Sequence, residues 1–78
     1  MNREAIWLDL GGSGVPTALQ LFRAIAANLN YDPQYFSLSG WLDILRAAAA
    51  DPDATFRERI RIKRIVVDLL RVARKENQ

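Results

Sequence analysis

Apolar residues recur at helical spacing in three segments of the chain, and polar residues occupy the opposite side of each segment. In residues 17–29 the apolar face carries Leu19, Phe22, Ile25, Ala26 and Leu29. In residues 41–50 it carries Trp41, Leu42, Ile44, Leu45, Ala48 and Ala49. Residues 55–75 contain no helix-breaking residue, and a helix of that length spans ~30 Å. The pattern predicts three amphipathic helices, the last of them long.

Local signals set the ends of the first predicted helix. Pro16 suits the first helical turn, where its missing N–H costs nothing, and Asn30 suits the C-terminal end. Residues 32–36 follow, with an Asp and a Pro that are typical of a single capped turn. We expect this turn to place Phe36 in the core.

The other two helices have their own start and stop signals. Residues 37–40 are expected to break the chain, with Ser39 as the N-cap of the middle helix. Pro52 disfavours helix at the residue before it, so the middle helix should end near residue 50. Thr55 and Glu58 have the spacing of a capping box, which predicts the start of the long helix and a helical hairpin around Pro52.

Residues 3–10 are compatible with two structures. Ile6, Leu8 and Leu10 stand at alternate positions, which is the spacing of a strand. Ile6, Trp7 and Leu10 also share one helical face, and Gly11 would then cap the end of the helix. Because no other segment alternates well enough to pair with a strand, we predict a short helix.

Together these elements predict an all-α fold, a small bundle of three to four helices with a long C-terminal helix. We divide the chain into a short apolar segment (residues 1–10), a Gly/Ser linker (residues 11–16) and a helical domain (residues 17–78). The linker begins with Gly-Gly-Ser-Gly and has two interpretations. It is a natural loop after a first helix, or it is a flexible tether that joins a docking peptide to its receptor in an engineered fusion.

The long helix carries more apolar surface than one neighbouring helix can cover. Between residues 65 and 73, every residue except Asp68 and Arg71 is apolar. An arc this wide predicts burial on more than one side. The covering surface would be the rest of the domain, a second copy of the chain or a bound peptide. If residues 1–10 dock, Trp7 is the expected anchor, since Trp dominates contact energies when it fills a pocket.

The composition excludes most enzymatic chemistry. With neither Cys nor His, the chain has no disulfide, no thiolate nucleophile, no zinc site of the usual kinds and no imidazole base. Its carboxylates form no pair at a defined spacing on one helical face. The glycine segment matches neither of the phosphate-binding patterns GxxxxGK(S/T) and GxGxxG. We therefore expect a protein that is not an enzyme, with no catalytic residue, cofactor or metal site. No apolar run approaches the ~20 residues of a membrane span and no secretion signal is indicated, so we expect the cytoplasm.

Charge is distributed unevenly along the chain. Residues 1–54 hold three basic and six acidic residues, whereas residues 55–78 hold eight basic and three acidic ones, for net charges of −3 and +5. The long helix concentrates this charge in a polar stripe formed by Arg57, Arg61, Arg64, Asp68, Arg71 and Lys75. In the simpler interpretation the stripe is a solvated face on which Asp68 pairs with Arg64 and Arg71. In the functional one, its arginines contact phosphates or acidic side chains.

These observations favour a non-enzymatic interaction module, an adaptor-like docking domain that binds a short amphipathic peptide or a partner helix in a groove between its helices. The alternative is a small dimeric regulator that binds nucleic acid through the basic stripe. The expected partner is thus another protein or peptide, or a second copy of the chain, with nucleic acid less favoured and no membrane. The candidate partner-binding residues are Ile6, Trp7, Leu10, Leu45, Arg57, Ile60, Arg61, Arg64, Ile65, Val67, Leu70 and Arg71.

Overall fold

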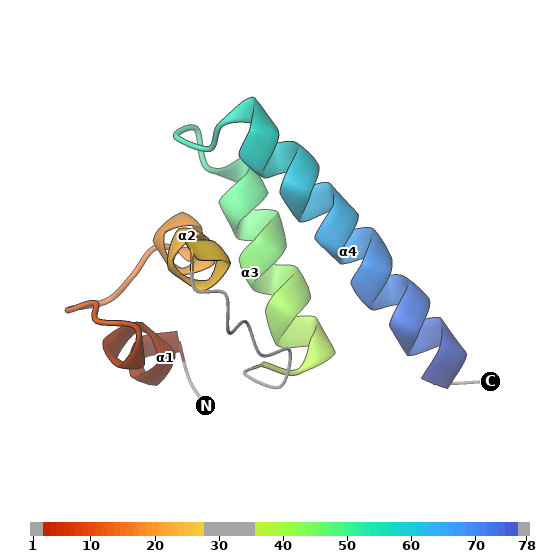
Figure 1. Cartoon of the computed structure of the whole chain (residues 1–78), viewed down its shortest axis with the longest axis horizontal. Coiled ribbons are helices and arrows are strands. Elements are labelled where there is room, and N and C mark those ends of the chain that lie inside the picture. The colour runs from red at the N-terminus through yellow and green to blue at the C-terminus, as the bar shows by residue number, and fades with distance from the viewer. Residues whose placement is uncertain (1–2, 28–35, 77–78) are drawn as a thin grey trace.

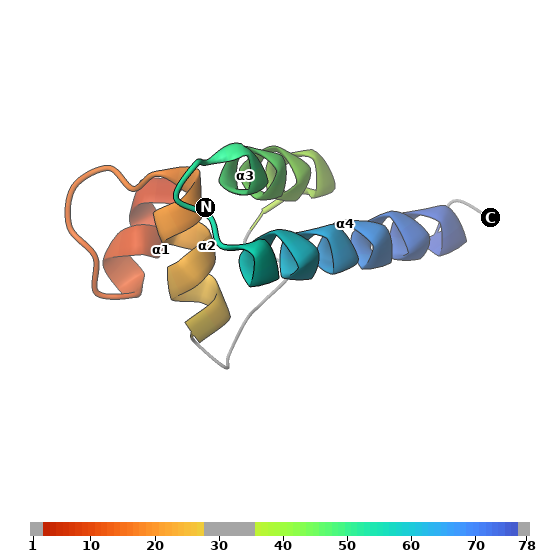
Figure 2. The same ribbon diagram turned by 90° about the horizontal axis from the view of Figure 1, so that it is seen from above.

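A computed structural model describes residues 3–27 and 36–76, and these residues form four α-helices (Figure 1). The helices are α1 (Arg3–Asp9), α2 (Ala18–Ala27), α3 (Leu38–Ala50) and α4 (Phe56–Glu76). α3 and α4 form a hairpin, α2 packs against α3, and α1 packs against α2. In both views α1 lies at the end of the molecule away from α4 (Figures 1 and 2). The predicted all-α bundle with a long C-terminal helix is confirmed.

The core lies between α2, α3 and the first half of α4, with one contribution from α1. The last buried residue of α4 is Ile62, and α1 contributes Ile6. The apolar faces predicted for the two middle helices are confirmed in the described residues. α2 also buries Leu21 beside its predicted face, because α2 is covered by α1 as well as by α3. The buried residues are Ile6, Leu19, Leu21, Phe22, Ile25, Trp41, Ile44, Leu45, Ala48, Ala54 and Ile62.

The glycine segment ends α1. Gly11 has a φ of 91° and its N–H donates to the Leu8 carbonyl, while the Gly12 N–H donates to the Trp7 carbonyl. This pair of hydrogen bonds is a Schellman motif, and it requires a left-handed residue that Gly provides without strain. The prediction of a short helix capped by Gly11 is confirmed.

α2 begins one residue later than predicted. Thr17, the predicted first residue, is instead the N-cap before Ala18. The Thr17 Oγ1 accepts from the Gln20 N–H at 3.1 Å, and the Gln20 Oε1 accepts from the Thr17 N–H at 2.9 Å. This reciprocal pair is a capping box, and Pro16 precedes it as a buried residue. The predictions for Leu29, Asn30 and residues 32–35 lie outside the described residues.

The start of α3 also differs from the prediction. Ser37, not Ser39, is the N-cap, and its Oγ accepts from the Gly40 N–H at 3.2 Å. Residues 38–40, expected to break the chain, form the first helical turn instead. Phe36 packs edge-on against Trp41 with ring centroids 4.8 Å apart, and it is partly buried against the core as expected.

The hairpin between α3 and α4 follows the sequence signals closely. α3 ends at Ala50, and its C-cap Asp51 has an extended ψ of 128°, which suits a residue before Pro. The capping box of α4 is formed, with the Glu58 N–H donating to the Thr55 Oγ1 at 3.1 Å and the Thr55 N–H to the Glu58 Oε1 at 2.9 Å. Arg59 then donates to the carbonyl of Ala49, one of the last acceptors of α3, and to the carbonyl of the C-cap Asp51.

Candidate interaction surfaces

The first candidate surface is organised by an ion pair between α2 and α4. Arg23 donates to both carboxylate oxygens of Glu58, from Nε at 2.7 Å and from Nη2 at 2.9 Å, and its Nη2 also donates to the Asp53 carbonyl. The hydrogen bond from Arg23, followed by that from the Thr55 N–H, lowers the pKa of Glu58 to about 2. The hydrogen bond to Glu58 in turn raises the pKa of Arg23. This pair fixes the N-terminus of α4 against α2.

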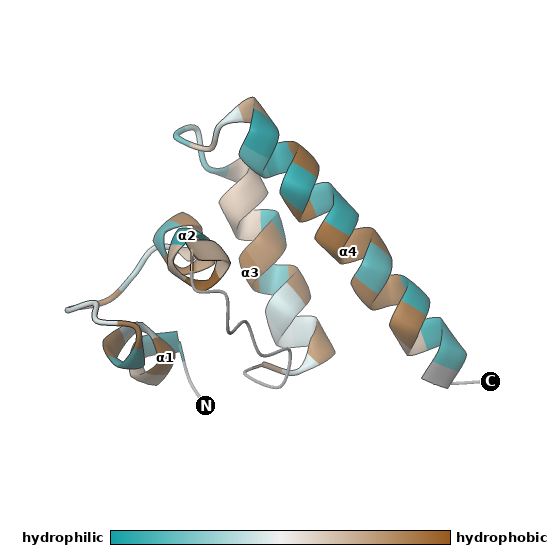
Figure 3. Ribbon diagram, viewed as in Figure 1, coloured by the Kyte–Doolittle hydropathy of each residue, from teal (hydrophilic) through white to brown (hydrophobic). Residues whose placement is uncertain are grey.

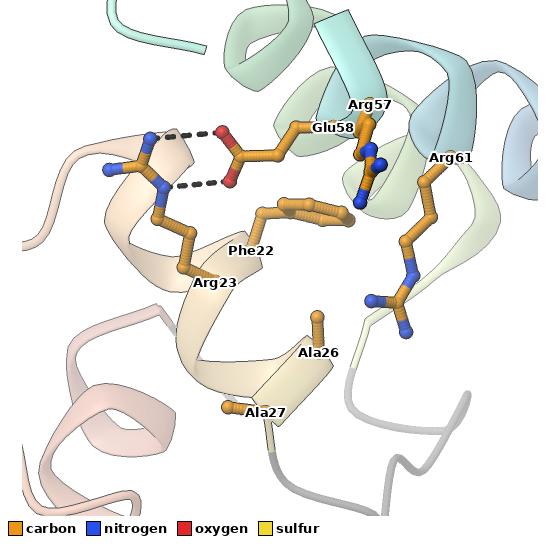
Figure 4. A pocket seen from close by; sticks show the side chains of 7 residues that line it. All are labelled: Phe22, Arg23, Ala26, Ala27, Arg57, Glu58 and Arg61. Carbon is orange, nitrogen blue, oxygen red and sulfur yellow. Dashed lines mark hydrogen bonds and ion pairs between the residues drawn. The ribbon is translucent and has the colours of Figure 1, made fainter. Parts of the chain in front are cut away.

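Next to this ion pair is an open pocket of about 320 Å³ between α2 and α4 (Figure 4). Its apolar side consists of Phe22, Ala26 and Ala27 from α2. Figure 4 shows Arg57 and Arg61 extending from α4 toward α2 on the other side of the pocket. Such a pocket could accept an apolar side chain that has an acidic neighbour, since the guanidinium groups favour a carboxylate.

The second candidate surface is the outer side of α4. Phe56, Ile60, Val67 and Leu70 are exposed large apolar residues, with Phe56 at 76% and Val67 at 46% of full exposure. At 3.6 residues per turn these four lie along one side of the helix, about a third of a turn from the side that faces α3. Figure 3 shows apolar positions interleaved with hydrophilic ones along the whole length of α4. We call Phe56, Ile60, Val67 and Leu70 the outer apolar side.

Burial of the apolar half of α4 is less extensive than predicted. Ile65, Val66 and Leu69 are only half-buried against the core, and Val72 is 54% exposed. No described residue of α4 beyond Ile62 is buried. Within a single chain, the apolar arc of residues 65–73 is therefore covered on one side and not on several. The reason is that α1 packs on α2 and does not reach α4.

The candidate residues of the apolar segment lie away from α4. Ile6 is buried, and Trp7 and Leu10 are half-buried against the core beside α2. The Trp7 indole lies over Gly12, where a Cβ would overlap its ring, and its Nε1 donates to the Ser13 carbonyl at 2.9 Å. In this structure the Gly-Gly-Ser-Gly segment thus lies against the Trp7 ring.

The candidate groove residues are not brought together. Leu45 is 1% exposed inside the core, and Ile65 is half-buried on a different side of α4 from Val67. Ile60, Val67 and Leu70 do share an exposed side. Phe56, which sequence reasoning missed, joins them, and its spacing of four residues from Ile60 is the signal that could have found it.

The candidate arginines are all exposed, and they divide between two surfaces. Arg57 and Arg61 line the pocket, whereas Arg64 and Arg71 lie beside the outer apolar side. The expected pairs of Asp68 with Arg64 and Arg71 are not formed; the ion pair found among residues 3–27 and 36–76 joins Arg23 to Glu58. The arginines of the polar stripe therefore form no ion pair among the described residues. Sequence reasoning missed the Arg23–Glu58 pair because its partners are 35 residues apart.

Two further findings concern the described residues. They contain no group of three or more metal-ligating side chains that could hold an ion. Neither α4, the longest described helix, nor any other described helix has the apolar length that a bilayer-spanning segment needs.

No protein-family model, curated protein or solved structure matches the chain. The candidate surfaces are therefore defined by the geometry and charge of this chain alone.

Proposed function

We propose that the protein is a non-enzymatic docking module that binds a short amphipathic peptide or a partner helix along α4. The observation that carries the proposal is the outer apolar side, where four large apolar residues are exposed on one side of one helix. Exposed apolar residues gathered in this way are typical of a protein–protein contact, in which an apolar helix face is laid against another.

The docking surface differs from the groove that the sequence suggested. With Leu45 inside the core, a partner would have to displace α3 or α4 to contact it. The outer apolar side needs no such rearrangement, because Ile60, Val67 and Leu70 are already exposed. Residues 1–10 are not the occupant in this arrangement, since Ile6 belongs to the core.

Binding to nucleic acid through the arginines is the second candidate. It is favoured by the exposure of Arg57, Arg61, Arg64 and Arg71 without an acidic partner among the described residues. Affinity for duplex DNA that falls steeply with salt, and that is indifferent to apolar substitutions on α4, would support this candidate over protein docking. A cytoplasmic location remains a prediction from the sequence.

Two Val residues of α4 provide a matched test of docking. Val67 lies on the outer apolar side, whereas Val72 has similar exposure but lies on nearly the opposite side of the helix. The test titrates the protein with two fluorescein-labelled peptides of three heptads. Both peptides have leucine at heptad positions a and d. One has glutamate at positions e and g (the glutamate peptide), and the other has lysine there (the lysine peptide).

We expect at least one peptide to bind, with affinity reduced at least tenfold by Val67→Glu and unchanged by Val72→Glu. The reason is that Val67→Glu places a charge in the apolar contact, where it would have to be desolvated. Fluorescence anisotropy measures both affinities. If neither peptide binds, or if the two variants lose affinity equally, the docking proposal is wrong.

A further inference from the structure

The outer side of α4 has the spacing of a coiled-coil seam. Positions alternate by four and three residues, the repeat with which two helices interdigitate along their length. Its members are Phe56, Ile60, Lys63, Val67, Leu70 and Arg74, and all six are exposed. We call these six residues the seam. It spans about 18 residues, or ~27 Å, which is the length of a helical peptide of five turns.

One flank of the seam consists of arginines. Arg57, Arg64 and Arg71 recur at intervals of seven, each directly after a seam residue, and all three are exposed. This is the position from which a coiled-coil helix contacts the flanking charges of its partner. The Arg57 side chain turns toward the pocket, so Arg64 and Arg71 are the two that present a guanidinium to whatever lies on the seam.

The opposite flank gives no compensating negative charge. Arg59 lies there with its guanidinium donating to the carbonyls of Ala49 and Asp51, and Val66 and Ala73 turn toward the core side. Of the acidic residues between Phe56 and Lys75, Glu58 is held by Arg23 and Asp68 lies beyond the arginine flank. Lys63 and Arg74 add two cations within the seam itself.

We propose that the seam takes an acidic amphipathic helix from a partner protein, and not a second copy of this chain. The inference rests on the proposed docking function and names the chemistry of its partner. In a parallel pair of copies, Lys63 would face Lys63; in an antiparallel pair, the arginine flanks would face each other. Glutamates beside an apolar stripe on a partner would instead meet Arg64 and Arg71, which is the favourable electrostatic arrangement.

The two peptides already described test this inference, because they differ only in the charge of positions e and g. Each repels itself, so self-association of the peptide does not compete with binding. We expect the glutamate peptide to bind on the order of tenfold more tightly than the lysine peptide in 50 mM salt, with the difference shrinking as salt screens the flanking charges.

A charge-reversal pair adds a matched control. Arg64→Glu changes the flank of the seam, whereas Arg46→Glu makes the same change at an exposed residue of α3 that belongs to neither candidate surface. We expect Arg64→Glu to weaken binding of the glutamate peptide several-fold and to strengthen binding of the lysine peptide, while Arg46→Glu shifts both affinities much less. Circular dichroism confirms that each variant is folded.

The outcomes separate this inference from the docking function. If both peptides bind with equal affinity and Val67→Glu abolishes the binding of both, the docking function stands and the inference of an acidic partner is wrong. If the protein alone forms a dimer by sedimentation velocity and Val67→Glu, but not Val72→Glu, makes it a monomer, a second copy is the occupant and the inference is overturned. If neither peptide binds, the docking function itself fails.

Discussion

The close approach of Trp7 and Gly12 explains at the level of single residues why α1 is followed by glycines. Gly11 adopts a positive φ that ends the helix, and Gly12 leaves room for the indole ring. The ring then reaches the Ser13 carbonyl through its Nε1. The segment thus owes its glycines to two different demands, one of backbone conformation and one of space.

Gly12→Ala tests the demand for space. Its Cβ would overlap the Trp7 indole, so the ring must move and lose its packing and its hydrogen bond to Ser13. We expect the free energy of unfolding to fall by ~1–3 kcal/mol, measured by urea denaturation followed by circular dichroism. Ser13→Ala is the control, because the acceptor is a main-chain carbonyl; it should change stability by less than ~0.5 kcal/mol. Equal effects of the two substitutions would contradict this role of Gly12.

Glu58 makes stability depend on pH. Its pKa is lowered from an ordinary value of 4.5 to about 2, first by Arg23 and then by the Thr55 N–H. A lowered pKa stabilises the folded state above the unfolded-state value, and this contribution is lost as pH falls from about 4.5 through about 2. We expect the urea midpoint of Glu58→Gln to fall less steeply over this range than that of the unsubstituted protein. Asp43→Asn, which changes an exposed carboxylate on α3, is the control and should leave the pH profile unchanged.

At the scale of the helices, local signals predicted more than the long-range arrangement. The capping box of Thr55 and Glu58 was predictable because its two partners are three residues apart and bond to each other. The equivalent box of Thr17 and Gln20 carries the same kind of signal, but Pro16 drew the predicted start one residue too early. The sequence favours Ser39 as the cap of α3 because Gly40 is typical of a chain break, whereas in the structure the Gly40 N–H donates to the Ser37 Oγ.

The start of α3 can be tested by comparing those two serines. Ser37→Ala removes the acceptor for the Gly40 N–H, so we expect it to reduce the free energy of unfolding by ~1 kcal/mol. Ser39→Ala keeps that acceptor and should cost clearly less, although it removes the contact between the two hydroxyls. Thermal and urea denaturation of both variants measures the difference. A larger loss of unfolding free energy for Ser39→Ala would mean that Ser39, as the sequence suggested, is the N-cap of α3.

The candidate surfaces could be predicted only in part, because helical periodicity shows which residues share a side but not what covers that side. The excess of apolar surface on α4 was visible in the sequence, and so were the exposed arginines. That Leu45 would be buried, while Ile60 and Val67 would remain exposed, depends on how α2 and α3 pack. The position of α1 on α2 likewise depends on the tertiary fold, and no spacing in the sequence indicated it.

At the scale of the whole molecule, the rest of the chain covers the two ends of α4 to different extents. Near the α3–α4 turn, α4 is anchored by Glu58 and Arg59 and contributes Ile62 to the core. Beyond Ile62 the helix continues with only partial cover from the rest of the chain. The end of α4 near the turn therefore holds the fold together while Phe56 and Ile60 stay exposed on it, and the rest of the helix has only partial cover.

Ile6→Ala asks whether α1 is part of this fold or a segment that merely rests on it. Ile6 is 1% exposed in the common core, so we expect its truncation to reduce the free energy of unfolding by ~2–5 kcal/mol. Leu8→Ala, on the same helix but at a residue 63% exposed, should cost less than ~1 kcal/mol.

In a Trp7→Phe background, fluorescence reports only on Trp41 in α3, while circular dichroism reports on all helices. If α1 belongs to the fold, Ile6→Ala shifts both transitions together, because loss of one core contact weakens a single cooperative unit. A shift in circular dichroism alone, with the Trp41 transition unchanged, would instead mean that residues 1–10 dock on and dissociate from an independently stable domain.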